Sequence, residues 1–450
     1  MTWPSRVSLF LAVWAFVSSA AAAQEPPPLT LAEAISLAER ADPGLAAASE
    51  AARAASERAR AAGRFWLPSV GLEAAWGRTD VPARVFAQKL NRGELSSEDL
   101  ALGSLNRPGS DSNLETSLGA RLPLDVSGTL RAAASRARAA AEAEGERARG
   151  ARGDLHLAVT EVFHGVAAAD REVEACEKSL EAARGLEREA QARRELGAAL
   201  ASDLLRARSR RRRREVEVAR ARSDSELLRS RLRSLLGWPS DRPLRLTASP
   251  AEDPEEPGDT LEEWTREALS GSPELAVARA NALAAREALR VERLSALPSL
   301  EAAGSYQDDR ARFSRGAQSG SVALQLRWSL WDPARRFRTA SAGAERAAAD
   351  AAARAAEIAT RLAVEARWRE LHLARLAADA ARADHADAGE VFRVARERWL
   401  AGKASMTDAL DAESELARAS AAEARAEAGV AAARAALERV AGASPGNESK

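Results

Sequence analysis

Cysteine, histidine and aromatic residues are scarce in this sequence of 450 residues, and each scarcity excludes a class of site or fold. The single cysteine, Cys176, rules out an intramolecular disulfide and a zinc site built from thiolates. The four histidines show neither HxxxH nor HExxH spacing, so we expect no metal site and no cofactor. Aromatic residues make up 4% of the chain while alanine is abundant, which favours long, closely packed helices over a thick globular core.

Long apolar runs are absent after the first residues. Residues 1–23 contain a basic Arg6, an apolar run from Val7 to Val17 and small residues that end in an A-x-A pattern, which predicts a signal peptide. The alternative is a membrane anchor, but eleven apolar residues are too few to cross a bilayer as a helix. No later stretch approaches 18 consecutive apolar residues. We therefore expect an exported chain that either stays soluble or enters a membrane as a β-barrel.

Charge of one sign is not in excess, because 66 basic residues balance 66 acidic ones. This balance argues against a nucleic-acid partner. The run Arg210–Arg214 is typical of a nucleic-acid patch, but in an exported chain we interpret it as a solvated helix face. No serine–histidine–aspartate set, phosphate-binding glycine loop or catalytic pair of carboxylates stands out, so the sequence predicts no enzyme.

The chain contains one sequence unit twice. Matching segments are separated by 230 residues early in the unit and by 205 residues later: Thr30–Glu33 with Thr260–Glu263, Leu67–Val70 with Leu297–Leu300, and Gly197 and Asp203 with Gly402 and Asp408. The smaller separation means that the first copy carries additional residues. They fall within Val81–Asp111, whose content of glycine, proline and asparagine predicts a loop.

The duplication predicts the organisation of the chain. Each repeat is expected to hold a β-hairpin followed by a coiled-coil hairpin, with a proline-rich linker between the repeats. The predicted segments are a first repeat at 24–238 with hairpins at 67–125 and 128–237, a linker at 239–259, and a second repeat at 260–450 with hairpins at 297–331 and 334–442.

Apolar and polar residues alternate in the predicted β-hairpins. Residues 321–330 place five apolar side chains on one face, opposite mostly polar ones. A length of about ten residues fits a strand of a transmembrane barrel, and an edge hairpin of a soluble sheet is the alternative. Arg121 and Arg327 fall on the polar face of their strands, where they would line the lumen of such a barrel or lie at its rim.

The predicted coiled-coil hairpins contain very long helices. The proline-free stretches Gly128–Leu196 and Ala334–Leu400 would each span about 100 Å, which implies a coiled coil or a helical barrel. After a glycine turn, a return helix is expected in each repeat. The combined length of the return helix and the helix before the strands nearly equals the length of the long helix. We therefore expect these two shorter helices to stack end to end beside the long one.

These paired features resemble the TolC-type outer-membrane efflux protein family over the whole mature chain. The resemblance is carried by the paired TL-x-E openings, the LPS motifs, the segment Leu330-Trp331-Asp332 and the two glycine turns. It implies an α+β membrane protein whose long helices form a periplasmic helical barrel. The four strands of each protomer would complete a 12-stranded β-barrel in outer-membrane lipid as a homotrimer. Three protomers are needed because four strands alone cannot close a barrel, and open sheet edges are not tolerated in lipid.

The resemblance also implies a function and site residues. The chain would be the passive exit duct of a tripartite efflux or type I secretion system in the cell outer membrane, fed by a periplasmic adaptor and an inner-membrane pump. The implied aperture residues, whose carboxylates would favour cations, are Asp203, Asp408 and Asp411. The implied adaptor contacts at the hairpin tips are Arg193, Gly197, Arg398, Gly402 and Ser405.

Two alternatives stay open at this point. Asp408 and Asp411 are also compatible with an acid pair that stabilises a helix N-terminus. The whole chain is also compatible with a soluble periplasmic coiled-coil adaptor or structural protein, although an adaptor is expected to show one helical hairpin rather than two. Ala404 stands where the family can carry an arginine that tethers the closed aperture, so such a latch is not predicted here. The sequence does not identify the cargo.

Overall fold

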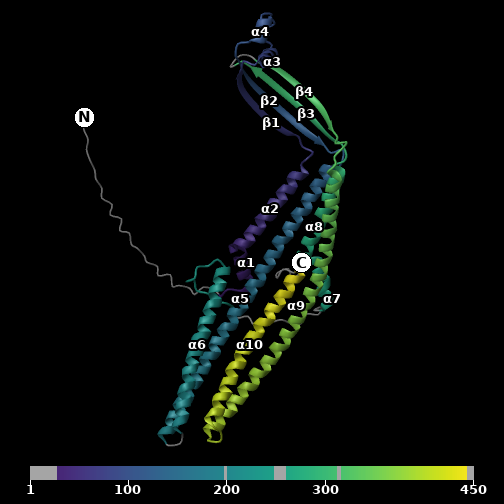
Figure 1. Cartoon of the computed structure of the whole chain (residues 1–450). Helices are drawn as coiled ribbons and strands as arrows, with labels where there is room; N and C mark the ends of the chain where they lie inside the picture. Colours follow the sequence, from purple (N-terminus) through teal and green to yellow (C-terminus); the bar gives the residue numbers. More distant parts are fainter. Residues whose placement is uncertain (1–27, 197–199, 248–259, 312–315, 443–450) are drawn as a thin grey trace, which may run out of the picture.

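The computed structural model describes residues 28–196, 200–247, 260–311 and 316–442. The predicted signal peptide at 1–23, Gly197 and most of the predicted linker lie outside these ranges. Figure 1 shows a long bundle of helices with a single sheet at one end and two helical hairpin tips at the other. Within the described ranges, every helix falls short of the length and apolarity that a bilayer crossing requires.

The order of elements repeats across the two halves of the chain. The first half contains α1 (Leu31–Ala41), α2 (Pro43–Gly63), β1 (Ser69–Thr79), α3 (Pro82–Arg92), α4 (Leu102–Asn106), β2 (Asp111–Leu124), α5 (Thr129–Glu195) and α6 (Ala201–Leu235). The second half contains α7 (Leu261–Gly271), α8 (Pro273–Leu294), β3 (Ser299–Arg310), β4 (Ala317–Arg327), α9 (Arg335–Leu400) and α10 (Met406–Ala441). The prediction of four strands with long helices is confirmed.

Local sequence signals explain where the helices begin. At the start of α1, Thr30 and Glu33 form a capping box in which each side chain bonds the backbone amide of the other residue. Thr260 likewise accepts a hydrogen bond from the amide of Glu263 at the start of α7. Pro43 and Pro273 occupy the first turns of α2 and α8, where the missing amide hydrogen costs no helical hydrogen bond.

The four strands form one antiparallel sheet in the order β1-β2-β3-β4. Register places Leu118 opposite both Leu72 and Tyr306, so these side chains share one face of the sheet. Ser117, one residue earlier, lies opposite Glu73 and Gln307 on the other face. The sheet therefore has one largely apolar face and one polar face, and β1 and β4 are its edges.

The bundle below the sheet consists of two long helices, each accompanied by two shorter ones. Helices α2 and α6 both pack along α5, and α8 and α10 both pack along α9. Helix α10 also packs against α5, which gives the lower half the order α6-α5-α10-α9 (Figure 1). Many of the buried residues are alanines, whose small side chains let the helices approach closely. This arrangement is the predicted end-to-end stacking.

The insert of the first repeat differs from the prediction of a loop, because it contains α3 and α4. Helix α3 has Pro82 in its first turn and ends at Gly93, whose φ of 69° suits glycine at a helix end. Arg92 is buried at the end of α3 and pairs with Asp111 of β2 at 2.6 Å. These local signals, together with that ion pair, outweigh a composition that is typical of loops.

The end of β4 also differs from its prediction. The alternating pattern runs to Leu330, but the strand ends at Arg327. The side chain of Trp328 donates a hydrogen bond from Nε1 to the carbonyl oxygen of Ala296, 3.0 Å away, just before β3. After Arg327 a side-chain contact takes the place of backbone pairing, so the last part of the alternation is not paired as a strand.

Candidate functional site

The second hairpin tip is shaped by residues that the sequence analysis selected. Gly402 has a φ of 69°, which closes the turn after α9. The amide of Asp408 donates to Ser405 Oγ at 3.2 Å, and the amide of Ser405 donates to Asp408 Oδ2 at 3.0 Å. Ser405 and Asp408 therefore form a capping box that starts α10. The alternative role of Asp408, an acid at a helix N-terminus, matches this geometry.

The first tip uses a weaker version of the same device. The carboxylate of Asp203 accepts a hydrogen bond from the amide of Leu200 at 3.3 Å. Leu200 has no side-chain oxygen that could accept a hydrogen bond from the amide of Asp203, so the first tip lacks the second hydrogen bond of a capping box. The exposed fractions of Leu196 and Leu200 are 84% and 70%, which leaves two large apolar side chains in solvent at this tip. Sequence analysis did not select these leucines, although apolar residues beside a glycine turn were a usable signal.

Arg193 joins the two tips within one chain. Its guanidinium donates to the carbonyl oxygens of Trp399 at 3.2 Å and Leu400 at 2.5 Å, and lies 4.9 Å from the centroid of the Trp399 ring. These carbonyls lie at the C-terminal end of α9, where a cation is well placed, and the carbonyl oxygen of Trp399 also accepts a hydrogen bond from the amide of Gly402 at 3.0 Å. Beneath this contact lies a buried apolar cluster from all four helix ends, made of Leu186, Ala190, Leu204, Ala207, Trp399, Met406, Ala409 and Leu410.

Asp411 lies one turn beyond the capping box, and its side chain is 73% exposed. Its carboxylate is 3.7 Å from the guanidinium of Arg210, which also donates to the carbonyl oxygen of Leu410 at 2.7 Å. Of the three predicted aperture residues, Asp203 and Asp408 are therefore engaged with the backbone of their own helices. Asp408 and Asp411 are exposed, whereas Asp203 is partly buried.

A buried ionic junction lies further from the tips and was missed by the sequence analysis. Glu413 of α10 is 2% exposed and accepts a hydrogen bond from Arg214 of α6 at 2.9 Å. Ser179 of α5 also bonds Glu413, and Glu217 pairs with Arg214. Burial alone would lower the pKa of Arg214, but the bonds to Glu217 and Glu413 hold that pKa above its usual range.

This junction corrects the prediction for Arg210–Arg214. The run was predicted to be a solvated helix face, yet Arg214 is buried and Arg210 is partly buried between the hairpins. Only Arg212 and Arg213 of the run are exposed. The spacing of Arg210 and Arg214, four residues apart on one helical face, was the available signal. Their partners on α10 could not be identified without the fold.

The two arginines predicted to line a lumen lie at the end of the sheet nearest the helices. Arg121 faces Ala303 in the register, and Arg327 faces Ser299. Both arginines are exposed and share the polar face of the sheet. Glu301 of β3 lies on the same face between these two positions, and sequence analysis did not select it. The polar face therefore carries an acid between two arginines at this end.

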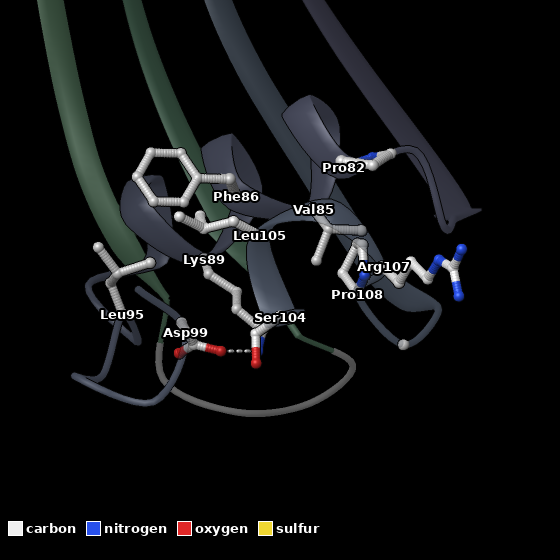
Figure 2. Close-up of a pocket in the computed structure, with 11 residues that line it drawn as sticks. Pro82, Val85, Phe86, Lys89, Leu95, Asp99, Ser104, Leu105, Arg107 and Pro108 are labelled. Carbon is white, nitrogen blue, oxygen red and sulfur yellow. Dashed lines mark hydrogen bonds and ion pairs between the residues drawn. The ribbon is translucent and has the colours of Figure 1, made fainter. Parts of the chain in front are cut away.

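A small pocket lies in the insert at the opposite end of the sheet (Figure 2). Its volume is about 190 Å³, and its lining includes Val85, Phe86 and Leu105. Lys89 Nζ and Asp99 Oδ1 are 2.6 Å apart at this pocket, and the hydrogen bond from Lys89 lowers the pKa of Asp99 to about 2. Within the described part of the chain, no group of three or more histidine, cysteine, aspartate or glutamate side chains is placed to hold a metal ion.

Comparisons with known proteins agree with this architecture. The sequence model described as "Outer membrane efflux protein" matches residues 34–238 and 264–443. No curated protein matches the chain. A solved membrane protein from Pseudomonas aeruginosa is similar, with a TM-score of 0.73 and 21% identity over 92% of this chain and 93% of that one.

Two further solved structures share the fold. The outer membrane protein VceC from Vibrio cholerae has a TM-score of 0.74 and 17% identity over 92% of this chain and 96% of that one. The MtrE outer membrane channel from Neisseria gonorrhoeae, solved in its open state, has a TM-score of 0.74 and 18% identity over 92% and 89%. The chain therefore belongs to the outer membrane efflux protein family and is a non-enzymatic efflux channel of the outer membrane.

Proposed function

We propose that three copies of this chain assemble into the exit duct of a tripartite efflux system. In this proposal the duct conducts substrates passively, from a periplasmic adaptor and an inner-membrane pump to the outside. A type I secretion system, which needs the same kind of duct, is the alternative setting. The cargo is set by the pump, and nothing at the described hairpin tips or sheet selects among drugs, metals and polypeptides.

The sheet carries the proposal for a trimer. Its edge strands, β1 and β4, have no further strand partner among the described residues. One face bears exposed apolar side chains, including Leu72, Trp76 and Val322. An edge strand in lipid leaves amide and carbonyl groups without hydrogen bonds, at a cost of several kcal/mol for each group. Pairing β4 of one copy with β1 of the next, three times, removes every edge and places the apolar face toward lipid.

The polar face and the hairpin tips supply the proposed path. Arg121 and Arg327 would face the lumen of the closed sheet, together with Glu301. At the other end, three copies of Asp411 would place three exposed carboxylates around the aperture, with Asp203 and Asp408 beside them. A ring of like charges favours cations over anions during passage.

The tips are the proposed adaptor contact. Arg398, Gly402 and Ser405 lie at the exposed second tip, and the first tip adds the exposed leucines 196 and 200. Exposed apolar side chains of this size mark a surface that gains from being covered. Arg193 is already bonded to the second tip, so in this proposal it orients the adaptor surface. Gly197 is proposed on sequence grounds alone.

We also propose the two-repeat organisation given above, with boundaries at 24–238 and 260–450. The matched lengths of α5 and α9, 67 and 66 residues, support this division. So do the lengths of α6 and α10, 35 and 36 residues.

The test is envelope fractionation of cells that express the chain with its own first residues. We expect a trimer in the outer-membrane fraction that keeps its mass in mild detergent and forms conducting pores in planar bilayers. A monomer recovered from the periplasm without detergent would refute the proposal and favour the soluble adaptor. Cross-linking from Arg398→Cys, an exposed position at the second tip, to a periplasmic adaptor tests the partner separately.

A further inference from the structure

We propose that the insert of the first repeat is a cap that obstructs the outer mouth of the duct and limits its cargo to small solutes, to the exclusion of polypeptides. The cap is defined as residues 80–110, which connect β1 to β2 and contain α3 and α4. In each copy it lies at the end of the sheet away from the helical bundle (Figure 1). This inference rests on the proposed function and adds the class of substrate that the duct can release.

The cap is attached to the polar face of the sheet. Arg92, the last residue of α3, pairs with Asp111 at 2.6 Å and donates to Asn113 Oδ1 at 3.5 Å. The side-chain amide of Asn113 donates in turn to Asp309 Oδ1 at 2.6 Å. Register puts these three partners of the cap on the same face as Ser117, which is the polar face. The cap is therefore bound to the surface that would face the lumen.

Burial agrees with a cover over this end of the polar face. Asn113 and Asp309 are 5% and 2% exposed, whereas Ser305, on the same face but further from the cap, is exposed. Helix α3 follows β1 in the chain, yet it packs against β3 and β4. The helix thus crosses the sheet on its polar side instead of extending away from it.

The cap is a folded unit. Val85 of α3 is buried, and with Phe86 and Leu105 it lines the pocket between α3 and α4 (Figure 2). Lys89 Nζ pairs with Asp99 Oδ1 at 2.6 Å and so connects α3 to the chain that leads into α4. Apolar contacts and an ion pair therefore hold the cap in one shape.

Arg92 is the anchor of this unit. Its side chain is 2% exposed, and besides Asp111 its guanidinium bonds Glu94 at 2.8 Å and the carbonyl oxygen of Ser112 at 3.3 Å. A planar guanidinium that bonds several oxygens at once fixes orientation as well as position. The cap is thereby held over the lumenal side of the sheet.

Three caps are large enough to obstruct the mouth of a barrel built from three copies. Twelve strands about 4.8 Å apart and tilted by about 40° enclose a circle roughly 24 Å across between backbones. Three helices of about 10 Å diameter, side by side, need a circle roughly 22 Å across. Helix α3, with 11 residues and a length of about 16 Å, is longer than the radius of that mouth. The space that remains suits small solutes and not a polypeptide chain.

The test measures which reagents reach the lumen from outside the cell. The full-length chain carries Cys176→Ser, and Ser305→Cys places one thiol on the polar face below the cap. Intact cells are treated with N-ethylmaleimide, or with a maleimide on a polyethylene-glycol chain as bulky as a small protein, which cannot cross the outer membrane. Leu102→Cys, at an exposed position of α4, shows whether the bulky reagent reaches the outer surface of the protein.

We expect N-ethylmaleimide to label both thiols and the bulky reagent to label only Leu102→Cys. Residues 80–110 are then replaced by Asn-Gly, a two-residue turn that fits the pairing of Thr79 with Asp111. This replacement should raise labelling of Ser305→Cys by the bulky reagent from background to the extent seen at Leu102→Cys.

A single substitution tests the anchor without removing the cap. Arg92→Ala should raise labelling of Ser305→Cys by the bulky reagent part of the way, because it releases the cap from Asp111 and Asn113. Arg84→Ala is the matched control, since Arg84 is an exposed arginine of the same helix, and it should leave that labelling at background.

Each other outcome overturns the inference. If the bulky reagent labels Ser305→Cys with the cap in place, the cap does not obstruct the mouth. The same holds if trimers without the cap, or with Arg92→Ala, still exclude the reagent; in both cases the duct itself stands. Secretion of a polypeptide through the unmodified chain refutes the limit on cargo. If Leu102→Cys is not labelled and no trimer is found in the outer membrane, the proposed function fails together with the cap.

Discussion

The buried junction between the two hairpins allows a quantitative prediction. Glu413→Ala would remove the buried carboxylate that Arg214 bonds across the hairpin interface, leaving the guanidinium with Glu217 and the Ser414 hydroxyl, and would leave the Ser179 hydroxyl without an acceptor. Removing one member of a buried ion pair costs about 3–5 kcal/mol when the remaining charge is uncompensated, and the retained pair with Glu217 places the expected loss at the lower end of that range. The loss is local, since Glu413 connects α5, α6 and α10 at one level.

Hydrogen exchange measures this effect where it occurs. A free-energy loss of about 3 kcal/mol corresponds to exchange that is about 100-fold faster, since each 1.4 kcal/mol is a factor of ten. We expect this acceleration in the amides of α6 and α10 around the junction and not in the sheet. Glu415→Ala is the matched control, because Glu415 pairs with Arg418 at an exposed position. Its expected cost is below about 1 kcal/mol.

A second variant separates the ion pair from the volume that it fills. Arg214→Met with Glu413→Leu replaces both charges by apolar groups, and such replacements of buried pairs are often neutral or stabilising. We therefore expect the double variant to exchange more slowly than Glu413→Ala. If Glu413→Ala exchanges like Glu415→Ala, or if the double variant is worse than the single one, the assigned role of this junction is wrong.

Four further outcomes follow from the structure. Arg193→Ala should accelerate amide hydrogen exchange in both hairpin turns about tenfold or more, because it removes two hydrogen bonds and a contact with the Trp399 ring. Unchanged exchange rates would show that Arg193 does not hold the two tips together. Gly442→Ala should lower the midpoint temperature of thermal unfolding. The Cβ of the alanine would lie 2.1 Å from the carbonyl oxygen of Gly271, and φ at this position is 76°. An unchanged midpoint would show that the backbone can move to relieve this close contact. The pKa of Asp99 is lowered to about 2, so the stabilisation by Lys89 is complete above the unfolded pKa of about 3.8 and is lost as pH falls through 2. Carbon NMR of the Asp99 carboxyl group should show this titration. A titration midpoint near 4 would contradict the prediction. Asp411→Asn should reduce cation selectivity, seen as a smaller reversal potential across a salt gradient in planar bilayers, and an unchanged potential would remove Asp411 from the aperture.

The elements that local signals encode were predictable from the sequence. The capping residues Thr30 and Thr260 and the absence of proline from the long helices determined where helices begin and how far they run. The strands followed from alternation because a residue period of two is expressed within a single strand. The duplication strengthened both predictions, since each signal occurs twice at a fixed separation.

The contacts between elements were not predictable in the same way. Arg214 and Glu413 are separated by 199 residues, and neither residue alone indicates that the other lies opposite. The insert was predicted to be a loop because its glycine and proline content masked the apolar face of α3. Glu301 was missed because its relation to Arg121 and Arg327 depends on strand register. Arg193 was predicted at the correct tip, but its engagement with α9 required the fold.

The unequal construction of the bundle has a mechanical consequence. Helices α5 and α9 run without interruption from the tips to the sheet, whereas their companions are divided into α6 with α2 and α10 with α8. A force applied at a tip is transmitted along the continuous helices α5 and α9. The shorter helices beside them can bend where their two parts meet. Bending should therefore concentrate at the level of α1 and α7, so that the lower coils can swing while the strand end of the molecule stays still.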